Sequence, residues 1–117
     1  MRRSDPFYAL GKLGEAVYAL ATGAGDVRSR LFSAFVFLLP VRADDFPVVL
    51  RQDFEWVIEM LTRRKSRYPQ LKGDLGATLK NMRNSTGVKI AKRIIEIESR
   101  LRGILYAERR RRKGVQG

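Results

Sequence analysis

The sequence predicts an all-α protein, a small antiparallel bundle of four to five helices with a long basic C-terminal helix. Three observations predict this fold. Apolar residues recur at spacings of three and four along most of the chain, which is the pattern of one helical face. No segment alternates between apolar and polar residues as a half-buried strand would. The segments between the helical patterns are short, which favours antiparallel neighbours.

The length of the chain leaves room for one domain. Its 117 residues include 44% hydrophobic residues, enough for a core and too many for a disordered basic tail. We expect a single helical domain over residues 1–108, followed by an arginine-rich extension over residues 109–117.

The first helix is expected to begin at Pro6, with Asp5 as its N-cap, because proline tolerates the first helical position and aspartate accepts the free backbone N–H groups. Its buried face is predicted to consist of Phe7, Leu10, Leu13, Val17 and Leu20. The segment 22–25, Thr-Gly-Ala-Gly, is expected to end the helix with a left-handed glycine.

Asp26 is predicted to cap a second helix, from about Val27 to Leu39, whose apolar residues surround the axis. Such a helix is expected to be buried on all sides. A third helix is predicted after Pro47. Its buried face should be Leu50, Phe54, Val57, Ile58 and Leu61, with Arg51, Asp53, Glu55 and Glu59 in water.

The remaining chain predicts one short and one long helix. Leu71, Leu75, Leu79 and Met82 suggest a short helix interrupted by Gly73 and Gly76. Residues 84–87 are expected to form a turn. The longest helix should then run from about Gly87 to Arg112, and its buried face is predicted to be Ile90, Ile94, Ile97, Leu101 and Ile104.

The absence of cysteine and histidine excludes several kinds of chemistry. Disulfides, thiol nucleophiles, Cys/His zinc sites and histidine acid–base catalysis are all ruled out. Carboxylates concentrate at Asp44, Asp45, Asp53, Glu55 and Glu59, but their spacing does not indicate convergence on one metal. We therefore expect no enzyme, no metal and no cofactor.

No segment predicts export or a membrane span. The apolar stretch near the N-terminus is broken by Lys12, Gly14 and Glu15, unlike the core of a signal peptide. The most apolar run, residues 31–39, is far shorter than the ~20 residues that a spanning helix needs. We expect a cytoplasmic protein.

The net charge of +12 belongs entirely to the second half of the chain. Residues 1–59 carry seven Lys/Arg against eight Asp/Glu, a net charge of −1, and residues 60–117 carry 17 against four, a net charge of +13. This asymmetry favours a polyanionic partner over charge that serves general solubility. Arginine carries more of this positive charge than lysine does, and arginine suits phosphate contacts.

The leading hypothesis is a small nucleic-acid-binding protein with an accessory or structural role, acting on DNA or RNA through the phosphate backbone. The arginine tail favours RNA slightly, and its helix should become ordered when phosphates neutralise it. The candidate nucleic-acid-binding residues are Arg63, Arg64, Lys65, Arg67, Lys80, Arg83, Lys89, Arg93, Arg100, Arg109, Arg110, Arg111 and Arg112. A helix-turn-helix over residues 75–101 is a weaker interpretation, because its second helix is too long.

The alternative is a protein-interaction adaptor or inhibitor, of the kind a phage or mobile element encodes, that docks on an acidic protein surface. Its candidate interface is Trp56 together with Val88, Ile95 and Tyr106, a second apolar face on the last helix. The same face would also serve a homodimer. A binder of anionic membrane surfaces is a third class that charge alone does not separate from these.

Overall fold

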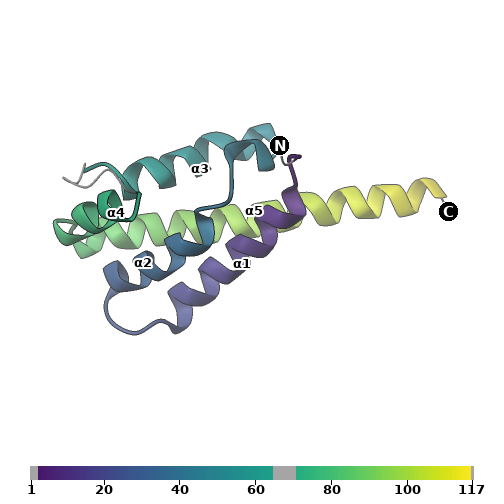
Figure 1. The fold of residues 1–117 in the computed structure, drawn as a ribbon. Coiled ribbons are helices and arrows are strands. Elements are labelled where there is room, and N and C mark those ends of the chain that lie inside the picture. The colour runs from purple at the N-terminus through teal and green to yellow at the C-terminus, as the bar shows by residue number, and fades with distance from the viewer. Residues whose placement is uncertain (1–2, 65–70, 117) are drawn as a thin grey trace.

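The computed structural model describes residues 3–64 and 71–116 and confirms the all-α prediction. In Figure 1, α5 runs the length of the molecule, with α3 along one side, α1 and α2 along the other, and α4 beside the start of α5. Within the described residues there is no strand. The elements are α1 (Pro6–Thr22), α2 (Val27–Leu38), the 3-10 turn η1 (Ala43–Asp45), α3 (Val48–Leu61), α4 (Leu71–Lys80) and α5 (Asn84–Gln116).

The first two helices begin where the sequence predicts. The Asp5 carboxylate accepts hydrogen bonds from the backbone N–H groups of Phe7 and Tyr8, both at 3.1 Å. Asp26 does the same for the second helix, accepting from the N–H groups two and three residues ahead at 3.0 and 3.2 Å. Each aspartate thus satisfies donors that a helix start leaves without intrahelical partners.

The predicted buried face of α1 is wrong in part. Phe7 is 69% exposed, and the buried residues are Ala9, Leu13, Ala16 and Leu20. The two alanines are fully buried, because their small side chains allow the neighbouring helices to approach closely. The pattern of large apolar residues alone therefore places the buried face too far around the helix.

Burial of α2 on all sides is also wrong. Leu31, Ala34, Phe35 and Leu38 form its buried face, while Phe32 and Val36 on the other side are each 40% exposed. A bundle of the five described helices is too small to surround one of them, and α2 lies at its outside. No helix among the described residues has a stretch long and apolar enough to cross a bilayer.

Three expectations about glycines and turns need correction. The left-handed residue after α1 is Gly25 (φ +84°), whereas the C-cap Gly23 is extended. Helix α4 continues through Gly76, where an added Cβ would meet nothing within 4 Å. Residues 84–87 are the first turn of α5, and Gly87 packs against α2, where a Cβ would lie 2.9 Å from Cγ1 of Val27. Close helix packing, not a turn, accounts for this glycine.

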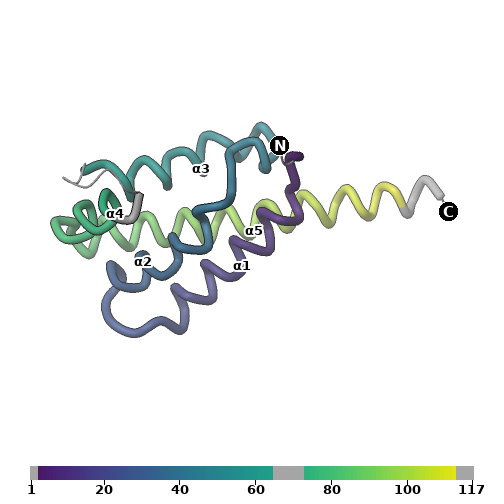
Figure 2. Tube along the Cα trace, in the orientation of Figure 1, coloured from purple at the N-terminus to yellow at the C-terminus, as the bar shows by residue number. Residues whose placement is uncertain are grey.

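The buried faces of α3 and α5 follow the prediction closely. Leu50, Phe54, Val57 and Leu61 of α3 are buried, with Ile58 partly buried. On α5, the predicted residues up to Leu101 are buried, Ile104 is partly buried and Leu105 adds a further core residue. Leu105 is the last residue of α5 that is described as buried, and the C-terminal end of α5 extends past the other helices (Figure 2).

Candidate nucleic-acid interface

Three of the predicted phosphate-binding residues meet in one place. Arg63 and Arg64 follow the end of α3, Arg83 precedes the first residue of α5, and all three line a hollow of about 280 Å³. We call this site the arginine hollow. Its remaining lining residues are Met60, Thr78, Asn81, Met82 and Thr86.

Hydrogen bonds between threonine hydroxyls and the backbone hold the first side of the arginine hollow. The N–H of Arg64 donates to Oγ1 of Thr78 at 2.9 Å, and that hydroxyl donates to the carbonyl of Asp74 at 2.8 Å. The Thr62 hydroxyl donates to the Ile58 carbonyl at 2.7 Å and closes the end of α3. The chain that leaves α3 is therefore held against α4, and Arg64 starts from a fixed backbone position.

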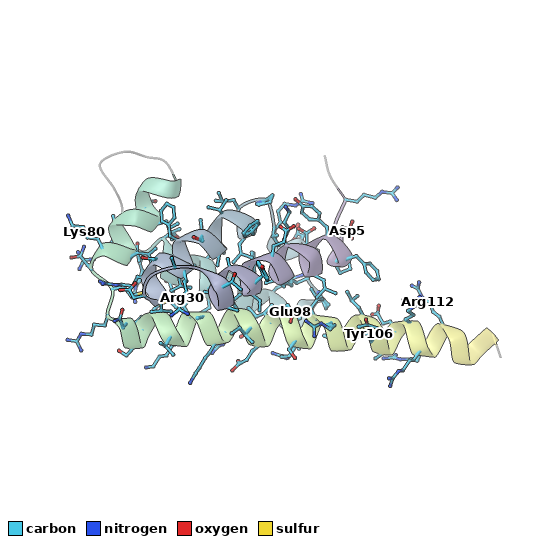
Figure 3. All side chains as sticks on the ribbon, turned by 90° about the horizontal axis from the view of Figure 1, so that it is seen from below. Asp5, Arg30, Lys80, Glu98, Tyr106 and Arg112 are labelled. Carbon is cyan, nitrogen blue, oxygen red and sulfur yellow. The ribbon has the colours of Figure 1, made fainter. Side chains whose placement is uncertain are left out.

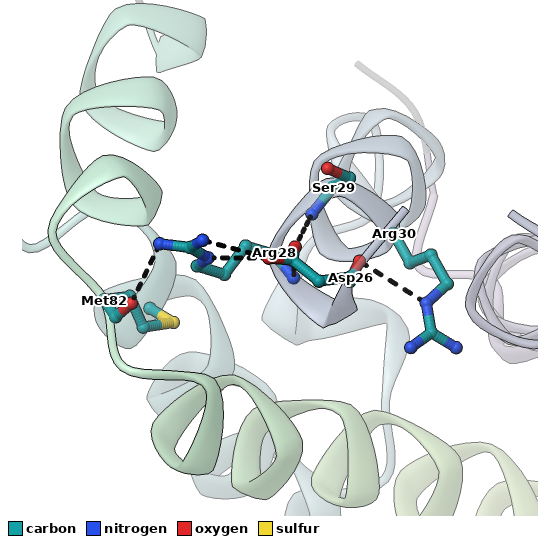
Figure 4. Close-up of polar contacts among 5 residues, drawn as sticks. All are labelled: Asp26, Arg28, Ser29, Arg30 and Met82. Atoms are coloured by element: carbon teal, nitrogen blue, oxygen red, sulfur yellow. Dashed lines mark hydrogen bonds and ion pairs between the residues drawn. The ribbon is translucent and has the colours of Figure 1, made fainter. Parts of the chain in front are cut away.

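The second side of the arginine hollow is fixed from α2. Nη1 of Arg28 donates to the carbonyl of Met82 at 3.5 Å, and the same guanidinium pairs with the Asp26 carboxylate at 2.9 Å (Figure 4). The hydrogen bond from the Arg28 side chain, followed by that from the Ser29 backbone, lowers the pKa of Asp26. The short turn before α5 is thus tied to the start of α2.

The guanidinium groups of the arginine hollow have no acidic partner within residues 3–64 and 71–116. Arg63 contacts Sδ of Met60 at 3.6 Å, and none of the three arginines forms an ion pair with a described carboxylate. Three like charges around one small space repel one another, and an anion placed between them relieves that repulsion.

Arg93 and Arg100 have a different environment from the one their sequence positions suggest. Nη1 of Arg93 and Nη1 of Arg100 donate to the two carboxylate oxygens of Asp53 on α3, each at 3.0 Å. The guanidinium carbon of Arg93 also lies 4.8 Å from the ring centroid of Trp56. These contacts join α3 to α5. They also place Trp56 beneath an arginine, apart from the other three residues of the predicted partner interface.

The sequence prediction missed the role of Asp53, which it assigned to the water-facing side of the third helix. Its side chain is 28% exposed and serves two arginines that lie 40 and 47 residues further along the chain. No local pattern marks such a pair of contacts. The only signal available was that Asp53 is an acid on a helix that must pack beside a basic one.

The other candidate cations lie along or beyond the bundle. Lys80 and Lys89 are exposed, and the described tail arginines, Arg109 to Arg112, are exposed on the part of α5 that follows the core. Figure 3 places Lys80 and Arg112 at opposite ends of a molecule whose longest extent is 56 Å. The basic residues are therefore spread along the length of the molecule, with the arginine hollow at one end and the tail at the other. Lys65 and Arg67 lie outside the described residues.

The second apolar face of α5 is exposed. Val88, Ile95 and Tyr106 are 42%, 45% and 57% exposed. Val88 and Ile95 line a groove of about 280 Å³ against α1 and α2, and Arg30 and Lys92 are the charged residues in its lining. This apolar groove lies on the side of α5 that α1 and α2 flank, whereas Arg93 and Arg100 reach toward α3.

The buried carboxylate of Asp45 connects two elements of the fold. Asp45, 1% exposed, accepts hydrogen bonds from the N–H groups of Asp5 and Arg42, both at 2.9 Å, and so joins the start of α1 to η1. Across the described part of the chain, no three acidic residues are placed to hold a metal ion together.

Comparisons of the chain with protein-family models, with curated proteins and with solved structures found no match.

Proposed function

We propose that the protein binds nucleic acid, DNA or RNA, through phosphate contacts, in an accessory or structural role. The observation that carries this proposal is the arginine hollow, where Arg63, Arg64 and Arg83 line one space without a described carboxylate partner. Guanidinium groups present paired N–H donors that match two phosphate oxygens, so a cluster of them favours phosphate over an anion without paired oxygens.

The exposed arginine tail supports the same function. Arg109 to Arg112 are consecutive residues on a helix, and steps of about 100° point their side chains to all sides of the axis. The tail follows Leu105, the last residue of α5 that is described as buried, so its arginines are not needed for the core. Cations of this kind attract the phosphate backbone without reading bases.

The test is fluorescence anisotropy against duplex DNA, single-stranded DNA and structured RNA at several salt concentrations. The log–log plot of affinity against salt should have a slope of several units. Arg63→Ala/Arg83→Ala and truncation before Arg109 should each make this slope shallower, by about 0.9 for every duplex phosphate that the variant no longer neutralises.

The matched control is Arg3→Ala/Lys12→Ala, which removes the same two charges as Arg63→Ala/Arg83→Ala from residues outside the arginine hollow. It should leave the slope close to that of the parent protein. Failure to bind any of the three nucleic acids with submicromolar affinity at low salt would overturn the proposal.

A second candidate function is an adaptor that docks on an acidic protein surface. The apolar groove favours it, because Val88 and Ile95 are exposed there and both charged lining residues, Arg30 and Lys92, are cationic. Val88→Ser/Ile95→Ser separates the two functions. It should leave nucleic-acid affinity unchanged under the leading proposal, since neither residue lies in the arginine hollow or the tail.

A further inference from the structure

We infer that the arginine hollow binds the terminal phosphate of a nucleic-acid strand, a phosphate monoester, in preference to the diesters within the strand. This inference rests on the proposed function and narrows its ligand. An internal diester carries one negative charge, whereas a terminal monoester carries about −1.5 to −2 at neutral pH. The three arginines that line the hollow carry more positive charge than a single diester can neutralise.

The number of hydrogen-bond donors points to the same ligand. Each guanidinium has five N–H donors, and within the described residues the side chains of these three arginines make one hydrogen bond, that of Arg63 with Met60. Thr86, from the first turn of α5, also lines the hollow and carries a hydroxyl. An internal diester offers two free oxygens, but a terminal phosphate offers three strong acceptors. The site has donors for all three.

Hydrogen bonds hold the backbone at two residues that line the hollow. Arg64 is held through its backbone by Thr78, and Met82 is held through its carbonyl by Arg28 (Figure 4). Met60 and Met82, both partly buried, add apolar surface to the walls of the hollow. A backbone that is held before binding reduces the entropy that the site loses when its ligand binds.

The location of the hollow suits the end of a strand. It lies at the corner where α3 ends and α5 begins, the end of the molecule opposite the tail (Figure 1). A strand that starts in this corner can extend along α5 toward the tail, so that its internal phosphates meet the exposed cations there. The two basic ends then have different ligands on the same strand.

The test compares oligonucleotides of one sequence that carry a 5′-phosphate, a 3′-phosphate or hydroxyl groups at both ends. We expect the full chain to bind one of the phosphorylated forms about tenfold more tightly than the hydroxyl form, because the terminal phosphate accepts several charge-assisted hydrogen bonds that the hydroxyl form lacks. Arg63→Ala/Arg83→Ala should abolish this preference, and Arg3→Ala/Lys12→Ala should keep it.

The pH dependence gives a readout that needs no variant. The second ionisation of a phosphate monoester lies near pH 6, while arginine remains charged. The preference should therefore shrink as the pH falls from about 7.5 to about 5.5, and binding of the hydroxyl form should not follow the same curve.

The outcomes separate this inference from the proposed function. Equal affinity for all three oligonucleotides, with a steep salt slope, overturns the terminal-phosphate site and leaves nucleic-acid binding standing. A preference that survives Arg63→Ala/Arg83→Ala, or one that does not change with pH, also overturns the site. Failure to bind any of the oligonucleotides at low salt overturns both proposals.

Discussion

At the scale of single residues, one carboxylate determines how two arginines are used. Asp53 accepts hydrogen bonds from Arg93 and Arg100, both at 3.0 Å, so α3 and α5 are joined by a cluster of three charges. Exposed ion pairs contribute little one at a time, but this carboxylate is shared and only 28% exposed. The same hydrogen bonds keep two cations from acting freely as phosphate ligands.

Replacing this residue should therefore move stability and nucleic-acid binding in opposite directions. Asp53→Ala should lower the free energy of unfolding by about 1 kcal/mol, because two neighbouring arginines lose their shared partner. It should raise nucleic-acid affinity and steepen the salt slope, by at most about 1.8 if both freed arginines reach phosphates. Urea unfolding and anisotropy measure the two effects.

The control for Asp53→Ala is Glu55→Ala on the same helix. Glu55 is exposed, and removing it changes the net charge equally without freeing an arginine from an ion pair among the described residues. If Asp53→Ala weakened folding and nucleic-acid binding together, the arginines would be serving the fold alone.

Asp26 gives the fold a pH-dependent contribution of known sign. The Arg28 side chain and the Ser29 N–H hold the pKa of Asp26 below its ordinary value. A lowered pKa stabilises the folded state above the unfolded-state pKa, and this stabilisation is lost as the pH falls through the folded-state value. Asp26→Asn keeps an oxygen that can cap α2 but removes the charge, so it should unfold at a lower temperature near pH 6.

The difference in Tm between the parent protein and Asp26→Asn should then shrink as the pH falls through the lowered pKa of Asp26, because the parent carboxylate becomes protonated. Thermal unfolding followed by circular dichroism measures this. A difference that stays constant over the range would show that Arg28 does not stabilise the ionised carboxylate.

At the scale of helices, the capped starts of α1 and α2 were predictable, whereas the start of α5 and the packing of α1 and α2 were not. Asp5 and Asp26 mark helix starts because capping depends on residues two and three positions away. The buried face of a helix depends on which other helices pack against it, so the burial of Ala9 and Ala16 was missed. Likewise, the sequence identifies Arg63 and Arg83 as cations of separate segments, and only the packing of α3, α4 and α5 brings them to one hollow.

Two glycines of α5 provide a paired test of that packing. Alanine favours a helix over glycine by up to about 1 kcal/mol. At Gly103 an added Cβ meets nothing within 4 Å, so Gly103→Ala should stabilise the protein by about 0.5–1 kcal/mol. At Gly87 the Cβ would lie 2.9 Å from Cγ1 of Val27, a β-branched side chain with little freedom to move.

Gly87→Ala should therefore destabilise the protein by about 1 kcal/mol, because overpacking outweighs the gain in helix propensity. Urea unfolding of both variants measures the contrast. Equal stabilisation by the two substitutions would mean that α2 does not pack against the first turn of α5 as closely as the structure indicates.

At the scale of the whole molecule, α5 sets the distance between two basic ends. At about 1.5 Å per residue, Arg112 lies about 42 Å along the helix axis from Asn84, the first residue of α5 and the neighbour of Arg83 in the arginine hollow. The charge between these ends is partly neutralised, since Asp53 holds Arg93 and Arg100. Under the proposed function, a ligand gains the full electrostatic attraction only when it reaches both ends.

This distance predicts a minimum length for tight binding. Duplex DNA rises about 3.4 Å per base pair, so about 12 base pairs span the separation. Affinity should rise steeply between duplexes of about 8 and about 14 base pairs and only slightly beyond, as measured by anisotropy at constant salt. Truncation before Arg109 should remove the steep rise, because no second basic end is left to reach. A parent protein that binds the short and long duplexes equally would show that the two ends do not act on one ligand.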